Sequence, residues 1–200
     1  MTGPVSAPHN KQRAAPKSYA ERVARLRVRS GFLLAAVYLL WAQPTPASLL
    51  AGAAVALAGL GLRAWSAGVL VKNCSLATGG PYAHTRNPLY LGSAIAALGF
   101  AIAGGRWWFF LLLGIFFAAV YWPVIRNEQA HLARLFPNEF PAYADAVPAL
   151  WPRLRPWRGA GSSARFSPQQ YRRNREHRAF LAYVIIVLFL LARMFLIGTD

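Results

Sequence analysis

Charged residues are scarce in this sequence of 200 residues. Only 14% of the positions are Asp, Glu, Lys or Arg, whereas soluble domains carry about 25%, and 56% are hydrophobic. The hydrophobic residues gather in blocks with almost no helical or alternating periodicity, so each block is apolar on all sides. These features exclude an ordinary soluble domain and predict an all-α, polytopic membrane helix bundle.

Several kinds of catalytic machinery are also missing. Cys74 is the single cysteine, which excludes an internal disulfide or a cysteine-rich metal site. With six acidic residues in the whole chain, a hydrolase that uses paired carboxylates has little to draw on. No nucleophile elbow, phosphate-binding loop or dinucleotide fingerprint is present. The histidines lack metal-ligand spacing, so we expect no metal; they are His9, His84, His131 and His177.

The hydrophobic blocks predict five transmembrane helices. The prolines of Gln43-Pro44-Thr45-Pro46 end the first helix, and Gly104-Gly105-Arg106 is short enough to force a helical hairpin. The predicted spans are 30–43, 47–71, 89–104, 107–125 and 179–198. The second span carries small residues suited to close helix packing, namely Gly52, Ala56, Gly59 and Ala67.

The positions of the basic residues predict the orientation of the chain in the membrane. The tail 1–29, the loop 72–88 and the stretch 126–178 hold nineteen of the 22 Lys and Arg, and with five spans all three lie on one face. The positive-inside rule therefore predicts a cytosolic N-terminus. The net charge of +16 is explained by topology and by anionic lipids, and we expect no nucleic-acid partner. The excess of Arg over Lys favours a high-GC bacterium and thus an inner membrane.

The same pattern divides the chain into four parts. We expect a basic cytosolic tail over 1–29 and a membrane core over 30–152. This core ends in an amphipathic cytosolic cap over 126–152. A basic cytosolic linker, 153–178, and an additional transmembrane helix, 179–198, follow. The last helix is interpreted either as a packing element or as one that closes a lateral opening.

Two polar clusters are predicted to lie on the cytosolic face. The first is the loop 80–92, which prolines hold extended, and it presents Arg86 and two tyrosines. In the second, Glu128, Leu132 and Phe136 share one helix stripe. Arg suits a carboxylate, Glu suits an ammonium or ribose hydroxyls, and tyrosine rings suit a sulfonium or an adenine. Interfacial Arg and Tyr are also ordinary membrane anchors, so the residue types alone leave both interpretations open.

At these residues the sequence resembles the isoprenylcysteine carboxyl methyltransferases and the related small phospholipid methyltransferases. The first family motif stands here as Gly80-x-Tyr82-x-x-x-Arg86-Asn87-Pro88-x-Tyr90-x-Gly92. The second stands as Glu128-Gln129, Leu132, Phe136-Pro137, Phe140, Tyr143 and Val147-Pro148. The match spans 72–152, and the hairpin between the motifs agrees as well.

The resemblance implies an integral membrane methyltransferase that uses S-adenosylmethionine and acts on a lipophilic acceptor, a carboxylate, thiol or amine. It implies that Arg86 and Glu128 are required for transfer. By the same resemblance the cofactor pocket is lined by Gly80, Tyr82, Arg86, Asn87, Pro88, Tyr90, Glu128 and Tyr143.

Three positions depart from the family pattern, and two further residues are candidates for the acceptor. Asn87 replaces a histidine and cannot shuttle a proton, Gln129 replaces a second Glu, and Pro137 replaces a Gly. His84 is either a proton-transfer substitute or a solvent-facing histidine. Arg63 either extends toward the lipid headgroups or lines the site from below.

Two other functions remain open from the sequence. A membrane reductase of the sterol type resembles this family in its C-terminal region but binds NADPH. A non-catalytic membrane scaffold would bind neither cofactor.

Overall fold

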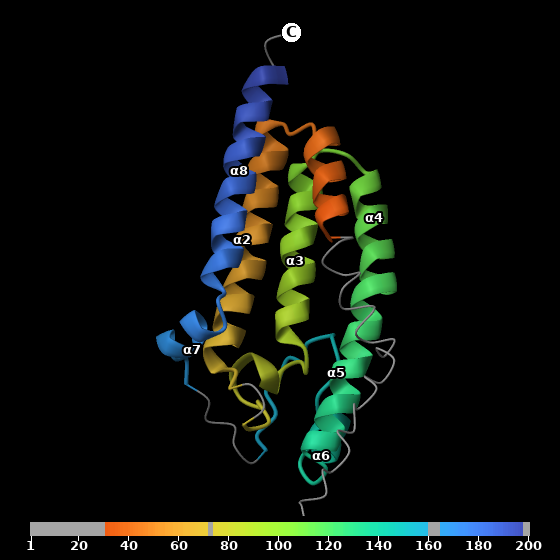
Figure 1. The fold of residues 1–200 in the computed structure, drawn as a ribbon, viewed down its shortest axis with the longest axis vertical. Helices are drawn as coiled ribbons and strands as arrows, with labels where there is room; N and C mark the ends of the chain where they lie inside the picture. Colours follow the sequence, from red (N-terminus) through yellow and green to blue (C-terminus); the bar gives the residue numbers. More distant parts are fainter. Residues whose placement is uncertain (1–30, 72–73, 160–164, 198–200) are drawn as a thin grey trace, which may run out of the picture.

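The computed structural model describes residues 31–71, 74–159 and 165–197, and within these ranges all regular structure is helical (Figure 1). Three helices are long and apolar enough to cross a membrane: Pro46–Val69, Trp108–Leu135 and His177–Leu196. Two shorter apolar helices are Gly31–Trp41 and Pro88–Ala103. The predicted all-α membrane bundle is confirmed, whereas the predicted tail 1–29 lies outside the described residues.

The break between the first two spans lies where the prolines predict it. Helix α2 (Pro46–Val69) begins with Thr45, whose side chain accepts from the Ser48 nitrogen, while the Ser48 hydroxyl accepts from the Thr45 nitrogen. This reciprocal capping satisfies backbone donors that the start of a helix leaves without partners. The preceding helix, Gly31–Trp41, packs through Tyr38, whose ring lies 4.9 Å from that of Phe109.

Helices α2 and α3 (Pro88–Ala103) lie side by side at backbone contact. A Cβ added at Gly59 would lie 2.4 Å from the backbone nitrogen of Ala96, and one added at Gly52 would lie 2.4 Å from that of Ala103. Because no side chain separates the helices at these points, any larger residue would push them apart. The predicted packing role of the small residues in the second span is therefore confirmed at Gly52 and Gly59.

The fourth apolar block forms one continuous helix with an irregular turn inside it. Helix α4 (Trp108–Phe116) passes through a π-helical segment, Phe117–Tyr121, into α5 (Trp122–Leu135). The wide turn directly precedes Pro123, which has no N–H to donate to the helix ladder. The helix thus continues ten residues beyond the predicted end at 125, and it carries the first part of the expected cap.

The chain then turns back through α6 (Phe140–Ala146), and the last two helices are α7 (Pro168–Arg173) and α8 (His177–Ile197). Helix α8 runs along α2 (Figure 1), and its Tyr183 hydroxyl donates to the Ala53 carbonyl at 3.1 Å. At its far end Arg193 donates to the carbonyls of Leu39 and Leu40, which closes the C-terminal end of the first helix.

The predicted basic linker is partly structured against the bundle. The Asn174 side chain, just after α7, donates to the Ala67 and Leu70 carbonyls at 2.8 and 3.1 Å, and the Ser167 nitrogen donates to Gly68. These bonds satisfy carbonyls that the end of α2 leaves without helical partners. The described part of the expected linker therefore includes a docked segment that fixes the start of α8.

Candidate functional site

A polar pocket of about 520 Å³ lies where the end of α2 meets η1 (the 3-10 turn Gly80–Ala83), the start of α3, α5 and α6. Both sequence clusters contribute to it, as the shared face of Glu128, Leu132 and Phe136 predicts. Seven of the eight expected cofactor residues line it: Tyr82, Arg86, Asn87, Pro88, Tyr90, Glu128 and Tyr143. Arg63 lines it as well, together with the polar residues Ser75, Ser93, Tyr121 and Glu176.

The loop that presents Arg86 is held by a strap, which we define as residues 148–157. The backbone nitrogen of Arg86 donates to the Pro148 carbonyl at 2.9 Å. The backbone nitrogens of Arg153 and Trp157, in the strap, donate to the carbonyls of His84 and Ala83. These backbone bonds run along the loop much as a strand pair would, although neither segment is a regular strand. The loop is thereby fixed in an extended form.

Side chains of the loop complete this attachment. The Thr85 hydroxyl, 2% exposed, donates to the Leu150 carbonyl at 3.1 Å. The Asn87 amide nitrogen donates to the Ala149 carbonyl at 2.7 Å. Asn87, which replaces the family histidine, therefore has a structural bond in addition to its place in the pocket wall.

Two buried tyrosines form the wall between the loop and α6. The Tyr143 hydroxyl donates to the Tyr82 carbonyl at 2.8 Å, and Tyr143 is only 2% exposed. Burial raises the pKa of both phenols above the usual range, and the nearby charge of Glu128 adds to the effect at Tyr82. Both are therefore neutral at physiological pH. The Tyr82 hydroxyl is buried and has no hydrogen-bond partner.

Arg86 is a cation with an unused hydrogen-bond donor. Its guanidinium lies 5.9 Å from the centre of the Phe140 ring, and its buried Nε has no hydrogen-bond partner. Partial burial lowers the pKa of Arg86, an effect that Tyr143 and Asp145 oppose. Its usual pKa is so high that it stays charged. Among the described residues it has no salt bridge, so the pocket offers an anion a strong donor.

Glu128 places a negative charge on the opposite wall. One of its carboxylate oxygens accepts from the Tyr90 hydroxyl at 2.8 Å, which links α5 to α3. The Tyr90 ring meets Tyr121 edge-on at 5.7 Å, and Tyr121 stacks on Phe117 at 5.3 Å. The π-helical segment therefore supplies the ring that supports Tyr90. Arg86 and Glu128 therefore place opposite charges in one pocket, which suits a zwitterionic ligand.

Arg63 and Glu176 form an ion pair at the α2 side of the pocket. The Arg63 Nε and Nη2 donate to the two Glu176 oxygens at 3.1 and 2.8 Å, in a bidentate arrangement. The third nitrogen donates to the Leu89 carbonyl and to the Ser93 hydroxyl. Of the two interpretations of Arg63, the structure favours the one in which it lines the site.

Two predicted residues stand apart from the pocket lining. Gly80 adopts a left-handed conformation (φ +59°) at the start of η1, so it shapes the turn that carries Tyr82. The Nδ1 atom of His84 lies 2.8 Å from the Arg153 carbonyl, and the ring does not line the pocket. Among the described residues no group of three His, Cys, Asp or Glu side chains has the arrangement of a metal site.

Glu176 was not found by sequence reasoning. It lies in the basic stretch before the last helix, 113 positions from Arg63 in sequence, and it has no motif around it. The available signal was charge: an acidic residue in a strongly basic segment needs a partner, and Arg63 is a cation inside an apolar block.

Comparison with known proteins identifies the segment that builds most of this pocket. Residues 48–139 match the sequence model of the phospholipid methyltransferase family. This segment, which is less than half of the chain, is similar to that family. It includes Arg86 and Glu128, the two residues that the family resemblance implies are required for transfer.

Two curated proteins are similar to this chain over part of its length. The cobalt-zinc-cadmium resistance protein CzcN of Cupriavidus metallidurans is 41% identical over 88 residues, which are 44% of this chain and 40% of that protein. The nickel-cobalt-cadmium resistance protein NccN of Alcaligenes xylosoxydans xylosoxydans is 39% identical over 83 residues, 42% of this chain and 38% of that protein. The match thus spans about two-fifths of the length of these relatives. No solved structure matches.

The similarity to the phospholipid methyltransferase family covers residues 48–139. Parts of the pocket lie beyond the matched segment. Tyr143, the strap and Glu176 all follow residue 139, so the wall at α6, the loop attachment and the partner of Arg63 come from the C-terminal part of the chain.

Proposed function

We propose that the protein is an S-adenosylmethionine-dependent methyltransferase that acts on a lipophilic or membrane-associated acceptor. The observation that carries this is the pair of opposite charges that line one polar pocket: Arg86, which has no salt bridge among the described residues, and Glu128. A cation and a carboxylate in one pocket suit a ligand that carries both charges. The methyltransferase family supports this choice of ligand.

The side chains fit the groups of this cofactor. Arg86 would hold the carboxylate, because it has no salt bridge among the described residues and partial burial strengthens a charge-assisted bond. Glu128 would hold the ammonium group or the ribose hydroxyls, oriented by the bond from Tyr90. The tyrosine rings of the pocket would face the sulfonium or the adenine.

The cofactor supplies an electrophilic methyl group, so the protein has mainly to align the acceptor with that methyl group and to exclude water. Fixed walls suit that task, and here the strap and the Tyr143–Tyr82 bond immobilise the loop of Arg86. Tyr82 and Tyr143 remain neutral, because burial raises the pKa of each, and so they add no charge that competes with Glu128. The acceptor would enter from the bilayer as a carboxylate, thiol or amine.

We further propose that the pocket faces the cytosol of a bacterium. The loop 80–88 and the start of the basic stretch carry it, and basic residues favour the cytosolic side of the inner membrane. The same surface would attract anionic lipid headgroups.

Calorimetry with detergent-purified protein tests the proposal. We expect micromolar binding of S-adenosylmethionine and S-adenosylhomocysteine that is lost in Arg86→Ala and in Glu128→Gln. Matched controls are Arg126→Ala and Glu139→Gln, which change exposed residues outside the pocket and should bind as wild type does. A folded wild type that binds neither ligand would contradict the proposal. Binding of NADPH instead would favour the reductase interpretation.

A further inference from the structure

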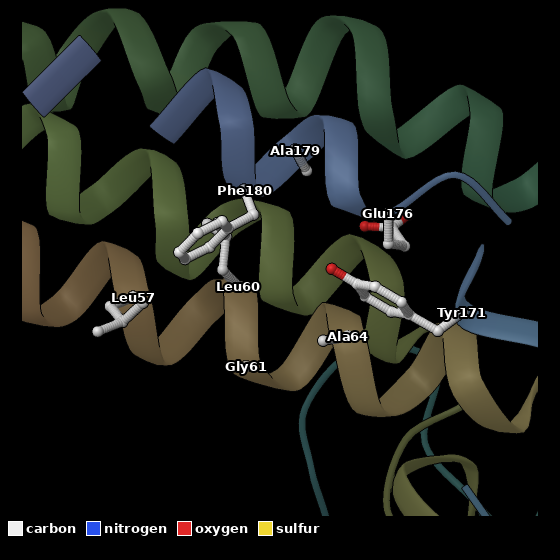
Figure 2. Close-up of a pocket in the computed structure, with 8 residues that line it drawn as sticks. All are labelled: Leu57, Leu60, Gly61, Ala64, Tyr171, Glu176, Ala179 and Phe180. Atoms are coloured by element: carbon white, nitrogen blue, oxygen red, sulfur yellow. The ribbon is translucent and has the colours of Figure 1, made fainter. Parts of the chain in front are cut away.

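A second cavity, of about 270 Å³, lies between α2 and the start of α8 (Figure 2). We call it the α2–α8 cavity. Its wall is mostly apolar and consists of Leu57, Leu60, Gly61, Ala64, Ala179 and Phe180, with Tyr171 and Glu176 at one end. In Figure 2 the Tyr171 and Phe180 rings reach from the C-terminal part of the chain over α2. The cavity lies between two helices that are long and apolar enough to span the membrane.

The α2–α8 cavity adjoins the polar pocket at the ion pair. Glu176 lines both spaces, and it is bound by Arg63, which lines the polar pocket. The ion pair therefore lies where the charged pocket meets the apolar cavity. An amphiphile whose head group lies in the polar pocket would have its chain directed into the cavity past these two side chains.

We propose that the α2–α8 cavity binds the hydrocarbon chain of the methyl acceptor, an amphiphile with a single alkyl chain. This rests on the proposed methyltransferase function, since it assigns the substrate class of the same site. Charge separation argues for it: the head group meets Arg63, Glu176 and Glu128, whereas the chain meets Leu57, Leu60 and Phe180. Apolar surface removed from water or headgroups favours such an arrangement.

The size of the cavity limits the chain. If each methylene fills about the 30 Å³ of a liquid water molecule, 270 Å³ corresponds to about nine methylene groups. Whole ligands of drug size occupy pockets of about 300–1,000 Å³, so the cavity suits one part of a ligand and not a two-chain lipid. The polar pocket, at about 520 Å³, is left for the head group and the cofactor.

Another apolar groove on the molecule is a less suitable site. It lies between α3 and α4 and measures about 570 Å³, with Gly114, Phe117 and Trp122 in its wall. None of its lining residues lines the polar pocket, whereas the α2–α8 cavity shares Glu176 with it. A chain in that groove would have no direct connection to the site.

Two glycines allow a matched test. A Cβ at Gly61, in the α2–α8 cavity, or at Gly114, in the α3–α4 groove, would meet no atom within 4 Å. Gly61→Leu and Gly114→Leu should therefore fold and fill one space each. Dodecanol with a diazirine on its chain serves as the probe, and labelled residues are located by mass spectrometry. Titration of each variant with S-adenosylhomocysteine shows whether the polar pocket is intact.

We expect labels to concentrate between Leu57 and Ala64 and on Ala179 and Phe180. Labelling there should fall about tenfold in Gly61→Leu, because the leucine displaces several methylene groups of the probe, and should not change in Gly114→Leu. Methyl transfer into extracted lipids is also compared between membranes that contain wild type and membranes that contain each variant. It should fall about tenfold in Gly61→Leu and should not change in Gly114→Leu.

Other outcomes would overturn the inference. If the labels fell on residues 113–118, and only Gly114→Leu suppressed them, the alkyl chain would bind in the α3–α4 groove and not in the α2–α8 cavity. Labels spread over the lipid-facing helices in every variant would mean that the cavity holds bulk lipid only. If the wild type failed to bind S-adenosylhomocysteine but labelled the cavity as expected, the proposed function would fail and the alkyl site would stand by itself.

Discussion

Replacement of Gly59 by alanine is expected to separate the two helices that support the site. The new Cβ would lie 2.4 Å from the Ala96 nitrogen and 2.6 Å from the Gly92 carbonyl oxygen. Non-bonded heavy atoms prefer about 3.5–4.0 Å, so α2 and α3 must part by about 1 Å at this point. Both close atoms belong to the backbone, so no side-chain rotation relieves the contact. Overpacking of this kind costs about 1–3 kcal/mol.

Gly61→Ala is the matched control, since it makes the same change two residues away on the same helix. Its Cβ would meet no atom within 4 Å. Alanine favours a helix over glycine by up to about 1 kcal/mol, so this variant should be equal to or more stable than wild type. Because the gain in helix propensity is common to both substitutions, their free energies of unfolding should differ by the cost of overpacking, about 1–3 kcal/mol.

Reversible unfolding in mixed detergent micelles, followed by circular dichroism, measures this difference. Helix α3 carries Asn87 and Tyr90 at its start, so Gly59→Ala should also weaken binding of S-adenosylmethionine, whereas Gly61→Ala should not. The reasoning would be refuted if Gly59→Ala were as stable as Gly61→Ala. If both variants were less stable than wild type, the cause would be the substitution of glycine within α2 and not the contact between α2 and α3.

Three further predictions concern the tyrosines of the pocket. Tyr143→Phe removes the bond to the Tyr82 carbonyl and should lower the free energy of unfolding by about 0.5–1.5 kcal/mol in the same assay. Burial raises the pKa of both tyrosines, so above about pH 10 they ionise in the unfolded chain while they stay neutral in the folded one. Stability should therefore fall as pH rises beyond that point, and less steeply in Tyr143→Phe; an unchanged slope would contradict the role of burial. Tyr90→Phe leaves Glu128 without its donor and should weaken S-adenosylmethionine binding about threefold to tenfold in calorimetry, whereas equal affinity would show that Glu128 needs no such orientation.

The helices and the two site clusters could be predicted because their signals are local. An apolar block defines a span, prolines at 44 and 46 define its boundary, and glycines at 52 and 59 indicate close packing. The spacing of Glu128, Leu132 and Phe136 gives a shared face on any α-helix, and all three line the polar pocket.

The attachments between distant segments could not be predicted in the same way. The strap binds the loop through backbone groups, which every residue possesses, so no residue type at Pro148 or Ala149 indicates that partner. His84 was a candidate because of its chemistry, yet its ring faces the Arg153 carbonyl. The π-helical turn, Phe117–Tyr121, has no fixed sequence pattern.

The two walls of the pocket are attached with unequal strength, and this indicates where it opens. The loop of Arg86 is held by the strap through backbone bonds and the buried side chains of Thr85 and Asn87. Across the pocket, the bond from Tyr90 to Glu128 is exposed, and α5 follows directly on the π-helical turn. Exposed bonds between separate helices open at lower free energy than buried networks. We therefore expect the cofactor to enter between α3 and α5, while the strap keeps Arg86 in place to receive it.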